Sequence, residues 1–485
     1  MTSTAPAPDH TLDTNAFLSA AQNLLGTRGF TADPDLLLPW LTDWRGRYTG
    51  RALAMASPET TAEVAALVKL CAEHGVPIVP QGGNSGMAGG ATPDASGAAI
   101  ILSLRRMSRV RELRAADGQI ICEAGVILQH LHDVAEEHGL RFPLTLGGKG
   151  SATIGGLVST NAGGTQVLRH GTMRAQVLGL EAVLANGDVF DGLTVLKKDN
   201  RGFDLKQLLI GSEGTLGIVT AACLRLLPAS SARVTIWAGL ASITAARTLL
   251  QRLQGAAGDT LEGFEVVPAH CLASVLAHQP SARAPLDTAH PWNALIEFVA
   301  SGKEQAALRD EIEAVLGRAL EDGLLDDAVI AAGERQADEF WALRDGISAA
   351  ERALGPAMQH DISVPVEAMP EFIAAASPKI EAEFPGTRAV AFGHLGDGNV
   401  HFHVLAPAGA QPGVWEEREG KAVSAMVYDL VRAWGGSISA EHGIGQMKVA
   451  ELVRLTDPVR LRMMRGVKQA LDPAGLLNPG KLLQP

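Results

Sequence analysis

The chain has few cysteines, and none of them forms a metal-binding pattern. The four cysteines, Cys71, Cys122, Cys223 and Cys271, are widely scattered along 485 residues. Because the sequence has no CxxC pair, a cysteine zinc site and a bound iron–sulfur cluster are excluded. Any metal must therefore be held by histidine and carboxylate side chains.

The sequence also lacks a long apolar run, a targeting segment and an excess of positive charge. The absence of an uninterrupted apolar run of about 18 residues predicts no membrane span. The N-terminal MTSTAPAPDHTLDT has neither a basic segment nor an apolar core, so it is not typical of a secretory signal, and we expect a cytoplasmic protein. The formal net charge of −12 argues against nucleic acid as the main partner, because phosphate binding needs a concentrated basic surface.

Glycine is the residue in excess. The 53 glycines among 485 residues are about 11% of the chain, against a usual share of about 7%. In loops such as QGGNSGMAGG the backbone can turn its amide groups toward a phosphate, because glycine tolerates positive φ. This loop does not match GxGxxG and is followed by an extended segment, so a Rossmann nicotinamide site is not expected. The Walker pattern of a P-loop is also missing, because Lys149 in GGKGS lacks its spacing.

Apolar spacing and turn residues divide the chain into two parts. The first is predicted to contain helices over 60–74 and 126–139, strands over 76–80 and 118–126, a long loop over 143–164, and a hairpin over 178–191 with a type I′ turn at Asn186-Gly187. From about residue 231, strands and helices alternate, which predicts a second domain with helices on one face of an antiparallel sheet. Its predicted strands include 235–240, 263–267, 292–300 and 361–366.

The stretch FGHLGDGNVHFHV places three histidines around a glycine turn. A two-residue turn at Asp397-Gly398 predicts that His394 directly faces His401, with Cβ atoms roughly 4.5 to 5.5 Å apart. Two imidazoles at that separation can share one cation. Strand alternation puts His401 and His403 on the same face. The alternative is that these are ordinary core or surface histidines.

A third ligand for such a cation is available in ISAEHGIG. This segment contributes Glu441 and His442. Two histidines and one carboxylate leave a coordination position open for substrate, which is the pattern of a catalytic zinc. Nitrogen and oxygen ligands alone do not distinguish zinc from manganese or another divalent ion.

The order of the glycine motifs is similar to that of a known flavoprotein family. VPQGGNSGMAGG, LGGKGSATIGGLVSTNAGG, VLGLEAVLANGDV, IGSEGTLGIVT and LDPAGLLNPGKL resemble the FAD-binding domain of the vanillyl-alcohol oxidase and p-cresol methylhydroxylase (PCMH) flavoproteins. Within that family the chain looks most like the D-2-hydroxyglutarate dehydrogenases and their D-lactate and other D-2-hydroxyacid relatives. The resemblance implies an α+β fold with an N-terminal helical segment (1–46), a PCMH-type FAD-binding domain (47–229), a substrate or cap domain with an antiparallel sheet (230–440), and a C-terminal segment that returns to the flavin (441–485).

The resemblance also implies where FAD binds. The first loop would cradle the pyrophosphate, the second would follow the ribityl chain and flavin ring, the third would hold the adenosine side, and Asn478 would lie near the isoalloxazine. The implied positions are Pro80, Gln81, Gly82, Gly83, Asn84, Ser85, Gly86, Gly147, Gly150, Ser151, Ile154, Gly155, Gly156, Thr160, Asn161, Gly163, Glu213, Gly214, Ile218 and Asn478. Cys71 and His74 precede the first loop on a predicted helix, so we expect FAD to be bound non-covalently.

The resemblance assigns roles to the histidine cluster and to a substrate pocket. The metal ligands would be His394, His401 and Glu441, and His442 would act as general base beside the substrate hydroxyl. The substrate residues would be Arg344, Ser348, Gln359 and His403, with Arg344 and Ser348 on one helix face. Hydroxyglutarate-oxidising members have Lys and Asn where this chain has Gln359 and His403, so we expect a dicarboxylate to bind less well and a neutral or monocarboxylate tail to suit the pocket.

These expectations combine into one leading function and several alternatives. The leading hypothesis is an FAD-dependent, metal-assisted dehydrogenase that oxidises a D-2-hydroxy acid and passes electrons to a separate acceptor, such as an electron-transfer flavoprotein or a quinone. The alternatives are an oxygen-reducing oxidase of the same fold, a zinc hydrolase, and a non-catalytic flavoprotein subunit of a larger complex. A homodimer is a reasonable expectation for a soluble enzyme.

Overall fold

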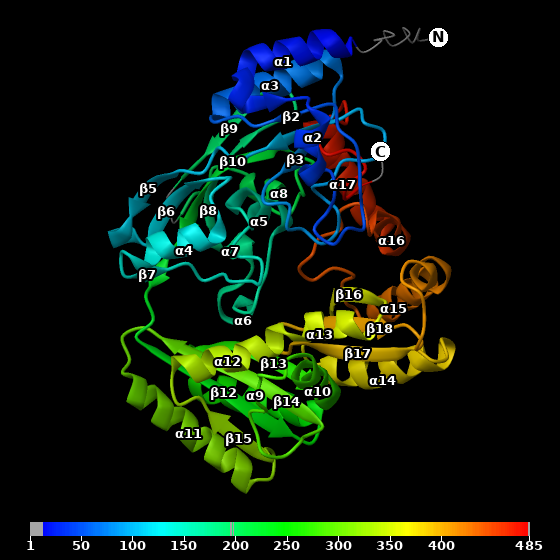
Figure 1. Cartoon of the computed structure of the whole chain (residues 1–485). Helices are drawn as coiled ribbons and strands as arrows, with labels where there is room; N and C mark the ends of the chain where they lie inside the picture. The colour runs from blue at the N-terminus through cyan, green and yellow to red at the C-terminus, as the bar shows by residue number, and fades with distance from the viewer. Residues whose placement is uncertain (1–12, 195, 197, 484–485) are drawn as a thin grey trace.

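The computed structural model describes residues 13–194, 196 and 198–483. The chain forms an upper half with two small sheets and a lower half with one large sheet, and α6 lies between them (Figure 1). The first twelve residues of the predicted N-terminal helical segment lie outside the described range. Within that range, no helix is both long and apolar enough to cross a membrane.

The first sheet of the upper half combines parallel strands with a packed helix. Its strand order is β1-β2-β4-β3, and β4 pairs in parallel with both β2 and β3. Helix α3 (Thr61–His74) confirms the prediction over 60–74. Thr60 caps its first turn by accepting a hydrogen bond from Glu63 N, and Gly75 ends it in a left-handed conformation. The other elements of this unit are α1 (Thr14–Gly29), β1 (Phe30–Thr31), α2 (Pro34–Leu37), η1 (Leu38–Trp40), β2 (Met55–Ala56), β3 (Ile78–Gln81) and β4 (Ile100–Ser103).

The second sheet is antiparallel, with the order β5-β6-β10-β8-β9. Its strands are β5 (Val110–Arg114), β6 (Gln119–Glu123), β8 (Val177–Val183), β9 (Val189–Gly192) and β10 (Ile218–Arg225). Beside it lie η2 (Ala115–Asp117), α4 (Leu128–Glu136), α5 (Ile154–Thr160), α6 (Val167–His170), α7 (Met173–Gln176), α8 (Lys206–Leu209) and the short pair β7 (Leu140–Arg141) and β11 (Leu227–Pro228).

Two predictions in this region were wrong. The predicted loop over 143–164 contains helix α5, because Ile154, Leu157 and Val158 bury an apolar face at helical spacing despite the glycines at 155 and 156. The hairpin turn is not type I′, which needs positive φ at both central residues. Only Gly187 has positive φ there, and Leu184 N donates to Asp188 O across a longer loop.

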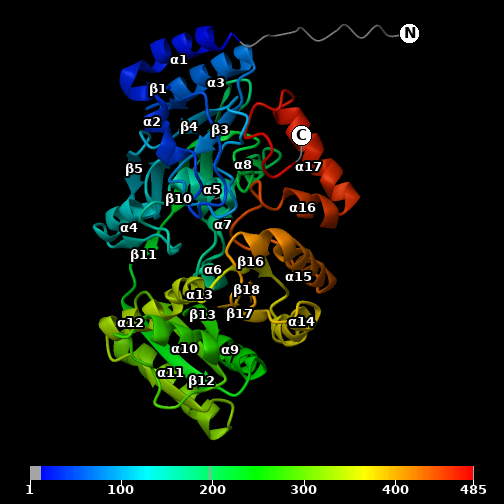
Figure 2. The ribbon, with the colours of Figure 1, turned by 45° about the vertical axis from the view of Figure 1, so that its right-hand side comes forward.

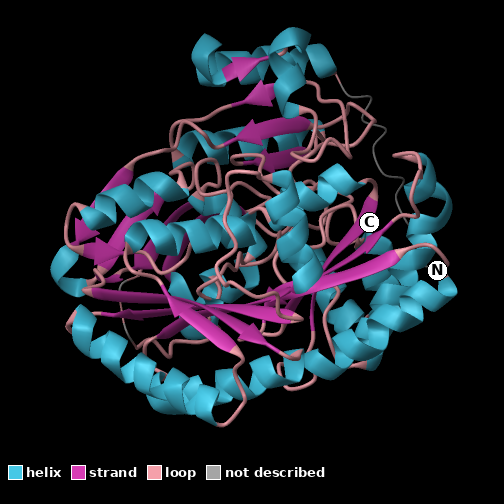
Figure 3. Cartoon of the chain, turned by 60° about the horizontal axis from the view of Figure 1, so that its bottom comes forward, coloured by secondary structure: helices cyan, strands magenta, loops and turns pink. Residues whose placement is uncertain are grey.

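The lower half has a seven-stranded antiparallel sheet in the order β15-β12-β14-β13-β17-β18-β16. Its strands are β12 (Ala232–Leu240), β13 (Leu261–Pro268), β14 (Trp292–Ala300), β15 (Asp327–Ile330), β16 (Ala357–Ser363), β17 (Arg388–His394) and β18 (Asn399–Leu405). Helices cover both faces, so the prediction of one covered face was wrong (Figure 3). Both faces need helices because the buried central strands carry apolar residues on both sides.

Two groups of helices divide these faces between them. One face packs against α9 (Ile243–Ala257), α11 (Gln305–Glu321), α14 (Met369–Glu383) and α15 (Lys421–Ala433), the last preceded by η3 (Glu416–Gly420). The other packs against α10 (Ala269–His278), α12 (Glu334–Asp345) and α13 (Ile347–Leu354). This second face is the one that looks toward the upper half in Figure 1.

The C-terminal segment returns to the upper half, which confirms the predicted α+β architecture. Helices α16 (Val449–Leu455) and α17 (Pro458–Leu471) lie beside the glycine loops (Figure 2). Leu476 and Leu477 are buried in the core of the first sheet. Ile78 N donates to Leu476 O, and Asn478 N donates to Ile78 O.

One buried carboxylate ties the two halves together. Glu262 on β13 is 1% exposed and accepts hydrogen bonds from Arg141, Gln166 and Arg169 of the upper half. Burial alone would raise the pKa of Glu262, but His170 and Arg141 hold it well below its usual range. Its ionised form is therefore stabilised by folding above the unfolded-state pKa, and this stabilisation is lost as the pH falls.

We predict that Glu262→Gln lowers the unfolding free energy by about 3 kcal/mol at neutral pH, because two arginines lose their partner. The difference in unfolding free energy between variant and wild type should shrink below about pH 4, because the Glu262 carboxylate then stabilises the wild type less. Denaturant titrations across pH measure both effects. Glu112→Gln, which removes an exposed partner of Arg114, is the control and should leave the unfolding free energy indistinguishable from that of wild type. A constant deficit at every pH would contradict the assignment.

Candidate functional site

The histidine hairpin has a different register from the predicted one. His394 pairs with Asn399, and His401 pairs with Phe392, so the prediction that His394 directly faces His401 was wrong. The loop is longer than two residues: Gly398 N donates to His394 O, and Asp397 caps Asn399 N. The two imidazoles still meet diagonally, with ring centroids 5.3 Å apart.

Strand alternation places the histidines as predicted. The ring of Phe392 lies 5.1 Å from that of His401 and 5.3 Å from that of His403, on the sheet face that looks toward the upper half. Phe402 points into the core on the opposite face. All three histidines of the stretch therefore share the face that looks toward the glycine loops.

Glu441 and His442 are brought to this face by a buried aspartate. Asp361 Oδ2 accepts hydrogen bonds from Glu441 N at 2.8 Å and His442 N at 2.9 Å. One ligand atom from each of His394, His401 and Glu441 lies within 4.8 Å of the others. The three predicted metal ligands, which come from the β17–β18 hairpin and from a segment 40 residues further along the chain, thus converge on one point.

The donor set suits a divalent cation. Burial raises the pKa of Glu441 to about 7 although His394 opposes the shift, so a further positive charge beside this partly exposed carboxylate would stabilise its ionised form. Burial also lowers the pKa of His401 well below its usual value, which leaves its imidazole neutral and able to ligate. Two histidines and a carboxylate with short gaps between their donor atoms fit a zinc-type ion.

Sequence reasoning missed the two carboxylates that support this cluster. Glu265 on β13 contacts His394 Nδ1 and accepts from Arg344 Nε at 2.8 Å. Its contact with Nδ1 leaves Nε2 of His394 free for a cation, which is how outer-shell carboxylates orient metal-bound histidines. The sequence did contain a signal for both, because each is a single carboxylate in an otherwise apolar strand. Glu265 lies in GFEVV, and Asp361 begins DISVPV.

Arg344 lies at the cluster, but the helix that was predicted to hold it is interrupted. Its Nη2 lies 3.2 Å from His401 Nε2 and 3.4 Å from His394 Nε2. Helix α12 ends at Asp345 and α13 begins at Ile347, so Arg344 and Ser348 occupy different helices and the prediction of one shared helix face was wrong. Arg344 therefore reaches the site from the end of α12.

The two residues that depart from the family pattern lie side by side. Gln359 on β16 pairs directly with His403 on β18. His403 Nδ1 lies 2.5 Å from Glu351 Oε2, and Gln359 Oε1 accepts from Arg45 Nη1 at 2.7 Å. His403 therefore contacts a carboxylate on α13 and is outside the three-residue donor group.

The first two glycine loops press against each other. An added Cβ at Gly83 would lie 1.7 Å from Ser151 O, and one at Gly82 would lie 2.2 Å from Thr153 Oγ1. Only glycine allows this approach. The loops that the sequence predicts to hold FAD are therefore one packed unit.

Four predicted FAD positions have a left-handed backbone although they are not glycine. They are Asn84, Asn161, Glu213 and Asn478, with φ between 44° and 53°. Across the described part of the chain, Leu482 is the one other non-glycine residue with positive φ. This conformation costs about 1–3 kcal/mol and concentrates at binding sites.

The third loop and the C-terminus join the cofactor loops to the histidine cluster. Glu213 accepts hydrogen bonds from Ile444 N and Gly445 N, both at 2.7 Å. Asn478 Nδ2 donates to Gly90 O at 2.9 Å and to Glu213 O at 2.8 Å. The Glu213 carboxylate thus holds the segment that carries Glu441, and the place of this loop on the adenosine side of FAD stays a prediction.

Other predicted FAD positions serve local structure through their side chains. Ile154 and Ile218 are fully buried in the two cores of the upper half. Thr160 Oγ1 donates to Gly156 O within α5, and an added Cβ at Gly155 would lie 2.7 Å from the Cβ of Ala124. At these positions only the backbone is available to contact a cofactor.

The same loops contain buried polar atoms without a hydrogen-bond partner, and glycines with open space around them. Three buried oxygens in them have no hydrogen-bond partner within the described range: Gln81 Oε1, Thr153 Oγ1 and Asn478 Oδ1. An added Cβ would meet nothing within 4 Å at Gly86, Gly147 and Gly150. Unpaired buried oxygens beside open glycine backbone fit a polar ligand such as FAD.

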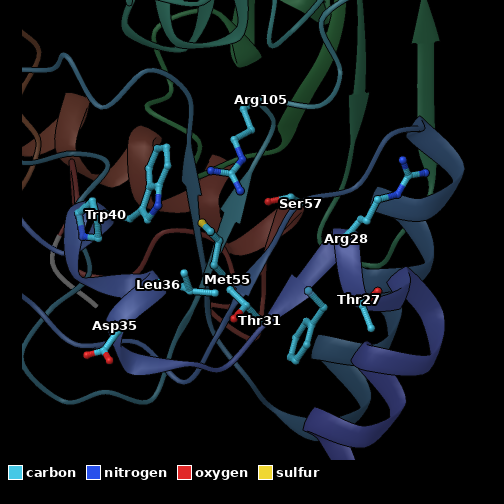
Figure 4. Close-up of a pocket in the computed structure, with 11 residues that line it drawn as sticks. Thr27, Arg28, Thr31, Asp35, Leu36, Trp40, Met55, Ser57 and Arg105 are labelled. Carbon is cyan, nitrogen blue, oxygen red and sulfur yellow. The ribbon is translucent and has the colours of Figure 1, made fainter.

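A separate pocket of about 350 Å³ opens near α2, away from the histidines. It is lined by Trp40, Met55, Ser57 and Arg105, and the guanidinium carbon of Arg105 lies 4.8 Å from the centre of the Trp40 ring (Figure 4). None of the predicted site residues lines this pocket.

Comparisons with known proteins agree with this arrangement. A model described as "FAD binding domain" matches residues 52–192, and one described as "FAD linked oxidases, C-terminal domain" matches residues 229–482. The chain is 37% identical over 466 residues to the mitochondrial D-2-hydroxyglutarate dehydrogenase of Bos taurus, covering 96% of this chain and 83% of the relative. It is 36% identical over 442 residues to D-2-hydroxyglutarate dehydrogenase of Xanthomonas citri pv. viticola, covering 91% of both chains. The chain belongs to the D-2-hydroxyglutarate dehydrogenase family.

Membership in this family identifies the protein as an FAD-dependent oxidoreductase that acts on a CH–OH group. The fold is also that of p-cresol methylhydroxylase, solved with substrate bound, with a TM-score of 0.76 at 18% identity over 96% of both chains. The resemblance inferred from the glycine motifs is therefore confirmed.

We predict that Glu265→Gln weakens zinc binding by about 10- to 100-fold, because His394 loses the carboxylate that orients it. Zinc titration against a competing chelator measures this, with FAD absorbance as a check on folding. Glu297→Gln is the matched control. Glu297 lies on β14, the strand next to β13, and its carboxylate accepts hydrogen bonds from Arg233 and Trp341. Equal zinc affinities in the two variants would show that Glu265 does not act through the histidine.

Proposed function

We propose that the protein oxidises a D-2-hydroxy acid of the D-2-hydroxyglutarate and D-lactate class to the 2-oxo acid, with non-covalently bound FAD and a divalent ion such as zinc. The observation that carries the proposal is the contact between the second glycine loop and the histidine cluster. An added Cβ at Gly163 would lie 3.4 Å from Glu441 Oε1. A flavin held by that loop would therefore lie beside the residues that bind the hydroxy acid.

His394, His401 and Glu441 would hold the metal, and Arg344 would bind the substrate carboxylate. A bound divalent ion polarises the hydroxyl group, and FAD accepts the hydride. Arg344 is a cation enclosed by the cluster and held by Glu265, so its remaining N–H groups can pair with a carboxylate in a fixed direction. Ser348, at the start of helix α13, would add a hydroxyl donor to the same pocket.

His442 would take the hydroxyl proton. Burial, assisted by the charge of Lys448, lowers the pKa of His442 to about 4, so its imidazole is neutral at physiological pH. A neutral imidazole can accept a proton, and Asp361, with Oδ2 3.6 Å from Nδ1, stabilises the imidazolium that results. Asp361 also holds the backbone of His442, so it positions the base.

The electrons then leave for a separate acceptor, for which an electron-transfer flavoprotein or a quinone is our prediction, because the chain has no cysteine pattern for an iron–sulfur cluster. A homodimer stays a prediction. So does the cytoplasmic location: the relative from Bos taurus is named mitochondrial, whereas the name of the Xanthomonas relative gives no compartment.

The proposal is tested by mixing the purified protein anaerobically with D- and L-2-hydroxy acids. We expect the D enantiomers of hydroxyglutarate, malate or lactate to bleach the flavin, and the L enantiomers to leave it oxidised. Protein stripped of metal by a chelator should keep its FAD but lose bleaching. Full activity without metal would rule out the metal-assisted mechanism, and rapid reoxidation of the bleached flavin by oxygen would identify an oxidase instead.

His442→Gln should lower the rate of flavin reduction by about 10²- to 10⁴-fold, because the proton acceptor is lost. Stopped-flow absorbance measures this rate, and metal and FAD contents should match those of wild type. His278→Gln on the exposed end of α10 is the control and should reduce the flavin at the wild-type rate. Unchanged reduction in the His442 variant would assign the base elsewhere.

A further inference from the structure

Arg45 reaches the proposed substrate pocket from a distant part of the sequence. It lies in the loop that connects η1 to β2, and Asp43 holds that loop by accepting hydrogen bonds from Tyr48 N at 2.6 Å and Arg45 N at 3.2 Å. Asn84 Nδ2 of the first glycine loop donates to Thr42 O at 2.9 Å. The loop is thus fixed against the predicted cofactor site, and its arginine is presented in a defined direction.

The guanidinium of Arg45 meets polar but uncharged partners. Nη1 donates to Gln359 Oε1 at 2.7 Å, and Nη2 lies 3.3 Å from Met87 Sδ. Over the described residues, no carboxylate forms an ion pair with Arg45 within 4.0 Å. Arg344 in the same pocket, by contrast, is paired with Glu265. Within the described part of the chain, Arg45 is therefore a cation without a counter-ion within 4.0 Å.

The surroundings of Arg45 favour an anion. Burial lowers the pKa of Arg45 to about 10, and the charges of Arg47 and Arg352 act in the same direction. A guanidinium with a pKa of about 10 is still charged at neutral pH. The exposed Arg47 and Arg352 add positive charge near it, while the carboxylates of Asp361 and Asp43 act in the opposite direction. An incoming carboxylate would relieve the repulsion among the three arginines.

The spacing along β16 matches a short dicarboxylate. Gln359, which holds Arg45, and Asp361, which holds Glu441 and His442, are separated by one residue and lie on the same face of the strand. Two residues of strand span about 7 Å, which is about the length of a five-carbon diacid.

We propose that Arg45 binds the distal carboxylate of a dicarboxylic D-2-hydroxy acid, with Gln359 orienting its guanidinium. This inference rests on the proposed function and deepens it. The guanidinium has five N–H donors, so the contacts to Gln359 and Met87 leave enough for a bidentate carboxylate contact. The expectation that Gln359 disfavours dicarboxylates is reversed: the positive charge comes from the N-terminal loop, and a neutral Gln359 beside it avoids repulsion between two cations.

The test compares two acids that differ only at the far end, D-2-hydroxyglutarate and D-2-hydroxyvalerate, on the holoenzyme. Arg45→Met should lower kcat/KM for hydroxyglutarate by about 100-fold, chiefly through KM, because a charge-assisted contact is lost. It should change kcat/KM for hydroxyvalerate by less than about threefold. Arg45→Met combined with Gln359→Lys should recover hydroxyglutarate turnover, because the cation returns at the neighbouring position. Arg51→Met, an exposed arginine of the same loop, should behave as wild type.

Equal losses on both acids would show that Arg45 is structural, and no loss on hydroxyglutarate would overturn the inference. A second measurement separates this from the proposed function. Glutarate and valerate, which cannot be oxidised, are titrated calorimetrically into the wild type and the Arg45 variant. If the wild type turned over neither hydroxy acid, the proposed function would fail; glutarate binding that disappears in Arg45→Met would still support the anion site, and unchanged binding would refute it.

Discussion

The site depends on the buried carboxylate of Asp361. It is 2% exposed, yet it accepts hydrogen bonds from the amides of Glu441 and His442 and from Asn399 Nδ2. Burial by itself would raise its pKa, but the neighbouring His442 ring, the Lys448 ammonium and the hydrogen bond from Glu441 N hold the pKa well below its usual range. Without this anion the backbone at Glu441 and His442 would lose the acceptor that fixes it over β16, and Glu441 would be held less firmly beside the histidines.

The two halves of the molecule depend on each other at this point. Glu213 of the upper half accepts the amides of Ile444 and Gly445, so the segment held by Asp361 on one side is held by a cofactor loop on the other. Glu262 of the lower half is paired with arginines of the upper half. Flavin loops and substrate groups must stay within contact distance for hydride transfer, and these buried carboxylates maintain that distance.

The abundance of glycine follows from the same requirement. Gly83 lies so close to Ser151 that a side chain cannot be placed between them, and Gly398 approaches Val364 O in the same way, with an added Cβ only 2.1 Å away. Positive φ is needed as well at Gly398, where the histidine hairpin turns. At these two positions glycine allows two backbones to meet, one between the cofactor loops and one at the turn that sets the spacing of the histidines.

The sequence by itself determined the family, the helix over 60–74, the antiparallel sheet and the shared face of His401 and His403. These follow from local patterns: glycine spacing, apolar periodicity and strand alternation act over a few residues. The tertiary structure alone decided the hairpin register, the helix break at Gly346, and the partners of buried charges such as Glu265 and Asp361. It also decided the contact between Arg45 and Gln359. These features depend on contacts between residues that are distant in the sequence. A buried charge pairs with the partner that the fold brings near it, and no local sequence pattern specifies that partner.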